Sequence, residues 1–151
     1  MNSKLIVFTI TRRSISAAAF IGKSVEHLET LHLSADPQKA LSSLSRVVSW
    51  AIEHFRPDSA AFSVSRVLRG ERIRLLREQA ETILRAAGLP IHQIEEDALL
   101  ENYGAKKVES KAALRSIALS FWPQFTKKKT GALDAALAGF YFQVERLLSH
   151  H

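Results

Sequence analysis

Three apolar runs near the start of the chain, separated by short polar breaks, predict strands. Residues 4–10 are mostly β-branched or aromatic and include a single charge, a pattern typical of a strand buried on both faces. Residues 14–21 and 24–33 follow as two further apolar runs, with Gly22 and Lys23 between them. A glycine at such a break favours a hairpin, so we expect three antiparallel strands.

Beyond residue 35 the apolar positions change to helical spacing. Asp36 can accept hydrogen bonds from the free N–H groups of a helix start, and Pro37 suits the first helical position because it has no N–H to leave unpaired. Apolar residues then recur every three or four positions, which predicts a helix that faces a sheet and ends before Pro57. The small, apolar run at 59–64 predicts a fourth buried strand.

The rest of the chain predicts alternating helices and strands. We expect a helix at 71–87, a strand at 89–94, short helices at 95–103 and 110–121, and a last helix from 131 to 148. Strand, helix, strand, helix, strand is a parallel crossover pattern. The predicted fold class is therefore α/β, with a mixed five-stranded sheet of three antiparallel strands and then parallel crossovers, flanked by helices.

The composition narrows the class of protein. The chain has 151 residues, of which 46% are hydrophobic, enough for the core of one domain over 1–151. Lysine and arginine number 21 against 15 acidic residues, a net charge of +6 that favours polyanions such as nucleic acid. The absence of cysteine excludes disulfides and thiolate metal sites. Without a membrane-length apolar run or a signal-peptide pattern, we expect a cytoplasmic protein.

Several local stretches follow one another in a distinctive order. They are a small-residue second strand, PD at 57–58 before the fourth strand, AAGLPI at 86–91, ESK at 109–111 and DAALA at 134–138. In this order they resemble the RuvC-type Holliday-junction resolvases of the ribonuclease-H-like superfamily, and the likeness covers nearly the whole chain. The resemblance implies a ribonuclease-H-like sheet, a homodimer and branched DNA as partner.

The same resemblance implies four metal-binding carboxylates, and most of them are missing here. The family's acid positions fall on Thr9, Ser63, Gly131 and Asp134, so only Asp134 keeps a carboxylate. Two-metal phosphodiester cleavage needs several oxygen anions converging on one point. We therefore predict a nucleic-acid-binding protein without nuclease activity, with Asp134 as the one candidate catalytic residue and no metal or other cofactor.

Basic residues near the predicted carboxyl ends of strands are the candidates for binding nucleic acid. Arg12 and Arg13 follow the first strand, and Arg66, Arg69 and Arg72 follow the fourth. Loops at this edge of an α/β sheet form its ligand crevice, where guanidinium groups can bind phosphates. The alternative reading of this region is a solvated helix face with internal pairs, namely Arg74 with Glu78 and Arg77 with Glu81.

Two lysine-rich stretches are further candidates. By resemblance, Lys106, Lys107 and Lys111 belong to a basic loop and to a lysine near the scissile strand. The run 127–129 lies close to Trp122 and Phe125, which suits single-stranded nucleic acid through charge and stacking. The same residues also fit a solvated lysine turn beside two aromatic core residues, and we favour that second interpretation.

Two other functions stay open at this stage. An active nuclease that needs Mg²⁺ would have to recruit other acids, such as Glu26, Asp58 or Glu95, to the crevice. A protein-interaction domain would keep the fold without the ligand, and it would show no salt-sensitive binding to any nucleic acid. A cleavage assay separates the first from the predicted function, and a salt titration separates the second.

Overall fold

Five strands form one mixed sheet in the order β3-β2-β1-β4-β5, which confirms the predicted fold class. The computed structural model describes residues 3–65, 70–103 and 110–149. The strands are β1 (Lys4–Ile10), β2 (Ser14–Ile21), β3 (Ser24–His32), β4 (Ser59–Val64) and β5 (Ile91–Glu95). β1 lies at the centre, antiparallel to β2 and parallel to β4. The carboxyl ends of β1, β4 and β5 therefore lie at the same edge of the sheet.

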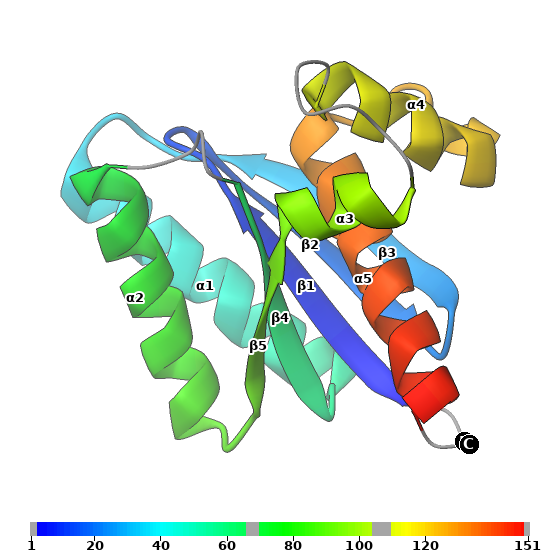
Figure 1. The fold of residues 1–151 in the computed structure, drawn as a ribbon. Helices are drawn as coiled ribbons and strands as arrows, with labels where there is room; N and C mark the ends of the chain where they lie inside the picture. Colours follow the sequence, from blue (N-terminus) through cyan, green and yellow to red (C-terminus); the bar gives the residue numbers. More distant parts are fainter. Residues whose placement is uncertain (1–2, 66–69, 104–109, 150–151) are drawn as a thin grey trace.

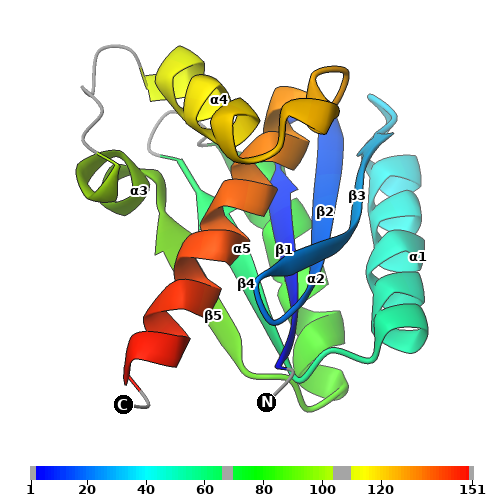
Figure 2. The ribbon, with the colours of Figure 1, turned by 90° about the vertical axis from the view of Figure 1, so that its right-hand side faces the viewer.

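Helices cover both faces of this sheet (Figures 1 and 2). One face carries α1 (Pro37–Phe55) and α2 (Glu71–Ala86). The other carries α5 (Thr130–Ser149), with α3 (Glu96–Asn102), α4 (Ser110–Phe121) and the short 3₁₀ helix η2 (Pro123–Phe125) beside it. Residues of β1 alternate between two cores: Ile6 and Phe8 pack toward α1 and α2, whereas Leu5 and Val7 pack toward α5.

Local sequence signals explain where the helices begin and end. Asp36 accepts a hydrogen bond from the Gln38 N–H at 3.2 Å and caps α1, as predicted. The fifth strand begins two residues later than predicted, at Ile91, because Leu89 still belongs to the end of α2. Its N–H donates to the Leu84 carbonyl at 3.1 Å, and Gly88 has the positive φ of 78° that this helix ending requires.

Small residues let α5 approach the sheet closely. Contacts run from α5 to β1, β2, β3 and β4, and the helix is buried from Ala132 to Gly139. A Cβ on Gly139 would overlap the ring of Phe20, so only glycine fits there without movement. This approach sets the first turn of α5 directly against the carboxyl end of β1. Within the described ranges, no helix is both long and apolar enough to cross a membrane.

Candidate functional site

The four positions that the resemblance assigns to carboxylates come together at one end of the sheet, on the face covered by α5. Thr9 lies near the end of β1, opposite Ser16 of β2. Ser63 follows Phe62, the partner of Phe8, and so lies beside Thr9. A Cβ on Gly131 would be 2.9 Å from the Ser16 Oγ and 3.9 Å from the Thr9 Cγ2.

The polar groups of this cluster are mostly hydroxyls. Asp134 lies one turn further along α5 than Gly131 and is 4% exposed. Thr9 is 3% exposed, and its Oγ1 has no hydrogen-bond partner among the described residues. The Ser16 and Thr30 hydroxyls share a hydrogen bond of 2.8 Å. A buried hydroxyl without a partner costs about 1–3 kcal/mol, and a neutral hydroxyl cannot balance a divalent charge.

This donor set does not fit a two-metal centre. Of the four positions only Asp134 offers an anionic oxygen, whereas magnesium sites use carboxylates together with water or phosphate oxygens. Across residues 3–65, 70–103 and 110–149, no three His, Cys, Asp or Glu side chains are arranged to hold a metal ion.

Two of the acids named for an active nuclease lie at the other end of the sheet. Asp58 Oδ2 accepts a hydrogen bond from the Lys4 N–H at 2.8 Å, and Glu26 lines a small cavity together with Lys4. Lys4 begins β1, five residues before Thr9, which is about 16 Å along a strand. Glu95 does lie at the carboxyl end of β5, where its side chain is exposed.

An acid that sequence reasoning did not single out follows Glu95. Glu96 is the first residue of α3 and is 7% exposed, an unusual burial for a glutamate. The available signal was a pair of acids directly after an apolar strand. A carboxylate in the first turn of a helix is stabilised by the helix dipole, which gives Glu96 a structural explanation.

Arg12 and Arg13 lie in the tight turn that joins β1 to β2, immediately beyond Thr9. The Thr11 N–H donates to the Ser14 carbonyl at 2.9 Å, and the Thr11 and Ser14 hydroxyls share a hydrogen bond of 2.6 Å. Both arginines are exposed, and neither side chain makes a hydrogen bond or ion pair with the part of the chain that the structure describes. The turn therefore presents two available guanidinium groups.

Arg72, a predicted phosphate contact, binds backbone carbonyls at the same end of the molecule. Its Nε donates to the Arg12 carbonyl at 2.6 Å, and its two terminal nitrogens donate to the Ser34 carbonyl at 2.5 Å and the Ala35 carbonyl at 3.4 Å. These bonds connect the start of α2 to the β1–β2 turn and to the segment before α1. Carbonyl oxygens do not neutralise the positive charge, so Arg72 still contributes to the local potential.

The charged residues of the rest of α2 partly form the ion pairs within the helix that the sequence offered as an alternative to phosphate binding. Arg74 pairs with Glu78 at 2.7 Å, as predicted, and also with Glu71. The hydrogen bonds to Glu71 and Glu78 raise the pKa of Arg74 above its ordinary value. The predicted pair between Arg77 and Glu81 is wrong, because Glu81 instead pairs with Arg85 at 3.3 Å.

Five predicted contacts cannot be placed. Arg66, Arg69, Lys106 and Lys107 lie outside the described residues, and Lys111 belongs to α4 but its side chain is not described. Their binding of nucleic acid stays a prediction.

The lysine run that precedes α5 is more ordered than a solvated turn would suggest. Lys128 Nζ donates to the Leu28 carbonyl of β3 at 2.8 Å. Arg115 of α4 donates to the carbonyls of Thr126 at 2.9 Å and Lys128 at 3.1 Å. Trp122 and Phe125 pack against the core, as we favoured from the sequence.

Together, the sheet order and the crossovers define a protein with the ribonuclease-H-like fold. Solved structures narrow this to its RuvC-type form. Thermus thermophilus RuvC is 14% identical with a TM-score of 0.69, over 94% of this chain and 96% of that chain. The same protein in complex with Holliday junction substrate is 12% identical with a TM-score of 0.71, over 95% and 96%.

The yeast mitochondrial Holliday junction resolvase Ydc2 has the same fold. It is 12% identical to this chain with a TM-score of 0.67, over 99% of this chain and 82% of that chain. No protein-family model and no curated protein sequence matches the chain. The predicted RuvC-type fold is thus confirmed by structural likeness at low identity.

Proposed function

We propose that this protein binds nucleic acid at the carboxyl end of its sheet and does not cut it. The observation that carries the proposal is the exposed Arg12–Arg13 turn beside a cluster in which Thr9, Ser63 and Gly131 stand at three of four acid positions. The solved complex of T. thermophilus RuvC with a Holliday junction supports branched DNA as the ligand. A homodimer and a role in recombination or repair belong to the same proposal.

Phosphate recognition follows from the charge at this end. Arg12 and Arg13 offer planar, permanently charged donors to phosphate oxygens. The net charge of +6 adds long-range attraction. Contacts of this kind position a nucleic acid without reading its sequence, so binding depends on salt and on the shape of the ligand rather than on base order.

The absence of cleavage follows from the donor set. Divalent ions stabilise the attacking and leaving oxygens of phosphodiester hydrolysis, and each ion must be held by several anionic or carbonyl oxygens. Asp134 alone would leave a magnesium ion coordinated mainly by water and weakly bound. Positive charge from arginine can hold a phosphate group but supplies no activated water.

Binding and cleavage are tested in parallel on labelled four-way junctions, flaps and single strands. We expect binding whose affinity falls steeply with salt, and intact strands after incubation in Mg²⁺ or Mn²⁺. Metal-dependent cutting that disappears in Asp134→Asn would overturn the non-cleaving part of the proposal. Binding that ignores salt would overturn the phosphate-directed part.

Thermal unfolding tests the metal site without an activity. A ligand present at one hundred times its Kd stabilises a protein by about 2.7 kcal/mol, which moves the Tm of a chain this size by about 5–10 °C. We expect no chelator-sensitive rise of this size for the wild type in millimolar Mg²⁺. A rise that Asp134→Asn abolishes would contradict the reasoning.

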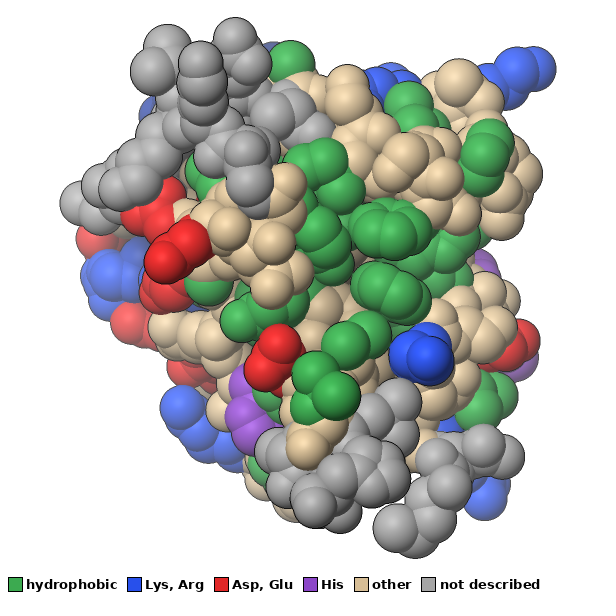
Figure 3. Space-filling view, turned by 45° about the vertical axis from the view of Figure 1, so that its right-hand side comes forward, with side chains coloured by type: hydrophobic (Ala, Val, Ile, Leu, Met, Phe, Trp, Pro, Cys, Tyr) green, Lys and Arg blue, Asp and Glu red, His purple; other side chains and the backbone are tan. Residues whose placement is uncertain are grey.

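A protein-interaction domain is the second candidate, favoured by an apolar surface over α3, α4 and α5 (Figure 3). Phe121 is 44% exposed there, and its ring lies within 6 Å of the rings of Tyr103, Trp122 and Phe140. Exposed aromatic clusters are typical of interaction surfaces. This function predicts no salt-sensitive binding to any nucleic acid, so the titration above distinguishes the two candidates.

A further inference from the structure

Basic side chains at the carboxyl end of the sheet fall into two groups by what their nitrogen atoms contact. Arg72, Arg115 and Lys128 donate to backbone carbonyls. The side chains of Lys127 and Lys129 are exposed and, like those of Arg12 and Arg13, make no hydrogen bond or ion pair with the described residues. The first group holds backbone in place, and the second is available to a ligand.

The segment between η2 and α5 is fixed at both of its ends. Arg115 binds the Thr126 and Lys128 carbonyls, so α4 holds this segment from one side. Lys128 reaches the Leu28 carbonyl of β3 from the other. The Leu133 N–H donates to the Lys129 carbonyl at 3.2 Å and joins the segment to α5. The backbone that carries Lys127 and Lys129 is thereby held on either side of Lys128.

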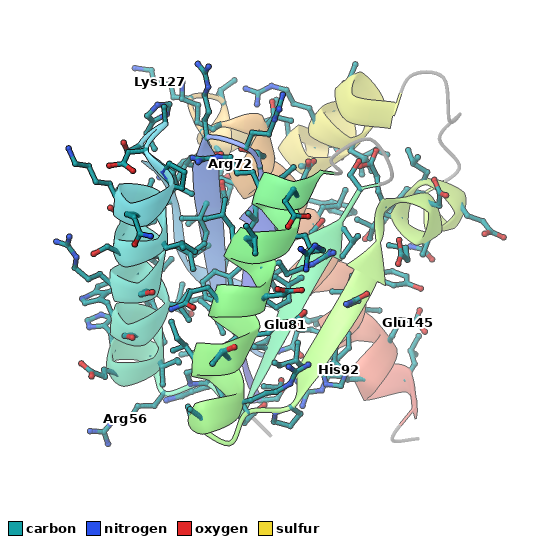
Figure 4. All side chains as sticks on the ribbon, turned by 90° about the vertical axis from the view of Figure 1, so that its left-hand side faces the viewer. Arg56, Arg72, Glu81, His92, Lys127 and Glu145 are labelled. Atoms are coloured by element: carbon teal, nitrogen blue, oxygen red, sulfur yellow. The ribbon has the colours of Figure 1, made fainter. Side chains whose placement is uncertain are left out.

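Chain connectivity brings this segment close to the arginine turn. Gly131, two residues after Lys129, lies against Thr9, and Arg12 follows Thr9 by three residues. Figure 4 shows Lys127 and Arg72 at one end of the molecule and Arg56 at the other. The two pairs of available cations therefore flank the first turn of α5.

Two acidic groups at this end have partners of their own. Asp36 caps α1 and Glu71 pairs with Arg74, so neither offers Lys127 or Lys129 an internal partner. Exposed cations gathered at one end of a molecule repel one another, and an anionic ligand offsets the repulsion. The charge complementarity points to a ligand that carries several phosphates.

We infer that Lys127 and Lys129 form a second phosphate-contacting arm, across the first turn of α5 from Arg12 and Arg13, and that Arg115 is its positioning residue. This inference rests on the proposed function and names further parts of the same interface. The ligand is the phosphodiester backbone of a nucleic acid long enough to reach both arms.

The test compares two double variants with equal loss of charge. Lys127→Gln/Lys129→Gln removes the arm, and Lys23→Gln/Arg56→Gln removes two exposed cations at the opposite end of the sheet. Binding of a labelled four-way junction is measured between about 50 and 200 mM salt, a range over which phosphate contacts make affinity fall steeply. The proteins compared have Tm values within about 2 °C of the wild type.

We expect the arm variant to bind at least about tenfold more weakly at 0.1 M salt, with the salt slope reduced by about 1.8 because each phosphate contact contributes about 0.9. The control variant should change affinity less than about threefold and keep its slope. Equal losses in the two variants would overturn this inference while leaving the proposed function intact. A wild type that shows no salt-sensitive binding would instead refute the proposed function.

Arg115→Lys tests the positioning role separately. Lysine keeps the charge but cannot donate to the Thr126 and Lys128 carbonyls in the geometry of the guanidinium fork. We expect a severalfold loss of affinity with a salt slope within about 0.5 of the wild type, because no phosphate contact is removed. Unchanged affinity, or a slope that falls by about 0.9, would contradict the positioning role.

Discussion

Replacing Gly131 by aspartate would restore one acid position of the resolvase pattern, and we expect the substitution to destabilise the fold. The first turn of α5 is packed too closely for a side chain: a Cβ at 131 would lie 2.9 Å from the Ser16 Oγ and 3.7 Å from the Ser16 Cβ. Ser16 can yield only by turning its hydroxyl away from Thr30, with which it shares a hydrogen bond of 2.8 Å.

The opposing contributions can be compared in magnitude. Overpacking a buried position costs about 1–3 kcal/mol, and a lost internal hydrogen bond costs about 0.5–1.5 kcal/mol. The new carboxylate also lies one turn from Asp134. Repulsion between two such carboxylates on a helix costs about 0.3 kcal/mol when both are exposed, and it costs at least that much at this buried site. Against this, a carboxylate near a helix start gains about 0.3–1 kcal/mol and leaving glycine gains a few tenths, about 0.3. The unfavourable contributions exceed the favourable ones by about 2 kcal/mol, so the free energy of unfolding falls by that amount and the Tm falls by about 4–8 °C.

Thermal unfolding of the wild type, Ser16→Ala, and both Gly131 substitutions in each of these two backgrounds isolates the causes. Gly131→Ala carries the steric part without charge and should show more than half of the loss of Gly131→Asp. In a Ser16→Ala background the obstructing oxygen is absent, so both substitutions should become milder by about 1 kcal/mol in a double-mutant cycle. If Gly131→Ala and Gly131→Asp both unfold within about 1 °C of the wild type, or show no coupling to Ser16, the reasoning about close packing fails.

Two further predictions concern stability. Arg72→Lys keeps the charge but loses the guanidinium group that binds three backbone carbonyls. We expect the free energy of unfolding to fall by about 1 kcal/mol, which lowers the Tm by about 2–4 °C. A lysine variant as stable as the wild type would contradict a stabilising role for these three bonds. Burial, with a smaller contribution from the nearby Tyr141, raises the pKa of Tyr103 above its ordinary value of 10.0. The stability that this shift contributes is present below pH 10 and is lost as the pH rises through the folded-state pKa, so denaturant unfolding near pH 11 should show less alkaline destabilisation in Tyr103→Phe than in the wild type.

The sequence predicts the architecture well because its signals are local and consistent. Apolar runs bounded by turn residues place β1, β2 and β4 at their observed bounds, and the Asp36–Pro37 pair places the start of α1. The fifth strand was misplaced at its start, since the hydrogen bond from the Leu89 N–H to the Leu84 carbonyl closes α2 beyond its last helical residue. The spacing of apolar residues in the sequence does not show how many residues beyond a helix still form hydrogen bonds with its last turn.

The position of the candidate site can be predicted from the sequence, but the contacts that its basic residues make cannot. The family pattern, laid on the sequence, predicts that Thr9 and Gly131 lie together. In the structure, a Cβ added to Gly131 would be 3.9 Å from the Thr9 Cγ2. By contrast, nothing in the sequence distinguishes Arg72, which binds carbonyls, from Arg12, which is available. That division depends on which carbonyls face which guanidinium after folding, a tertiary property that charge counting cannot reveal.

Uncharged residues at three of the four acid positions also bear on the stability of this end of the sheet. Several acids held close together repel one another and are expensive to bury, so an active centre of this kind costs stability unless metal offsets it. Here Thr9 is buried beneath the first turn of α5, which contains Gly131. None of the family's four acid positions belongs to the two hydrophobic cores on either side of the sheet. Threonine, serine and glycine at these positions avoid such repulsion, and Gly131 allows the close approach of α5 to the sheet. The exposed side chains of Arg12, Arg13, Lys127 and Lys129 lie outside these cores, so we expect substitutions there to change the proposed binding without affecting the fold.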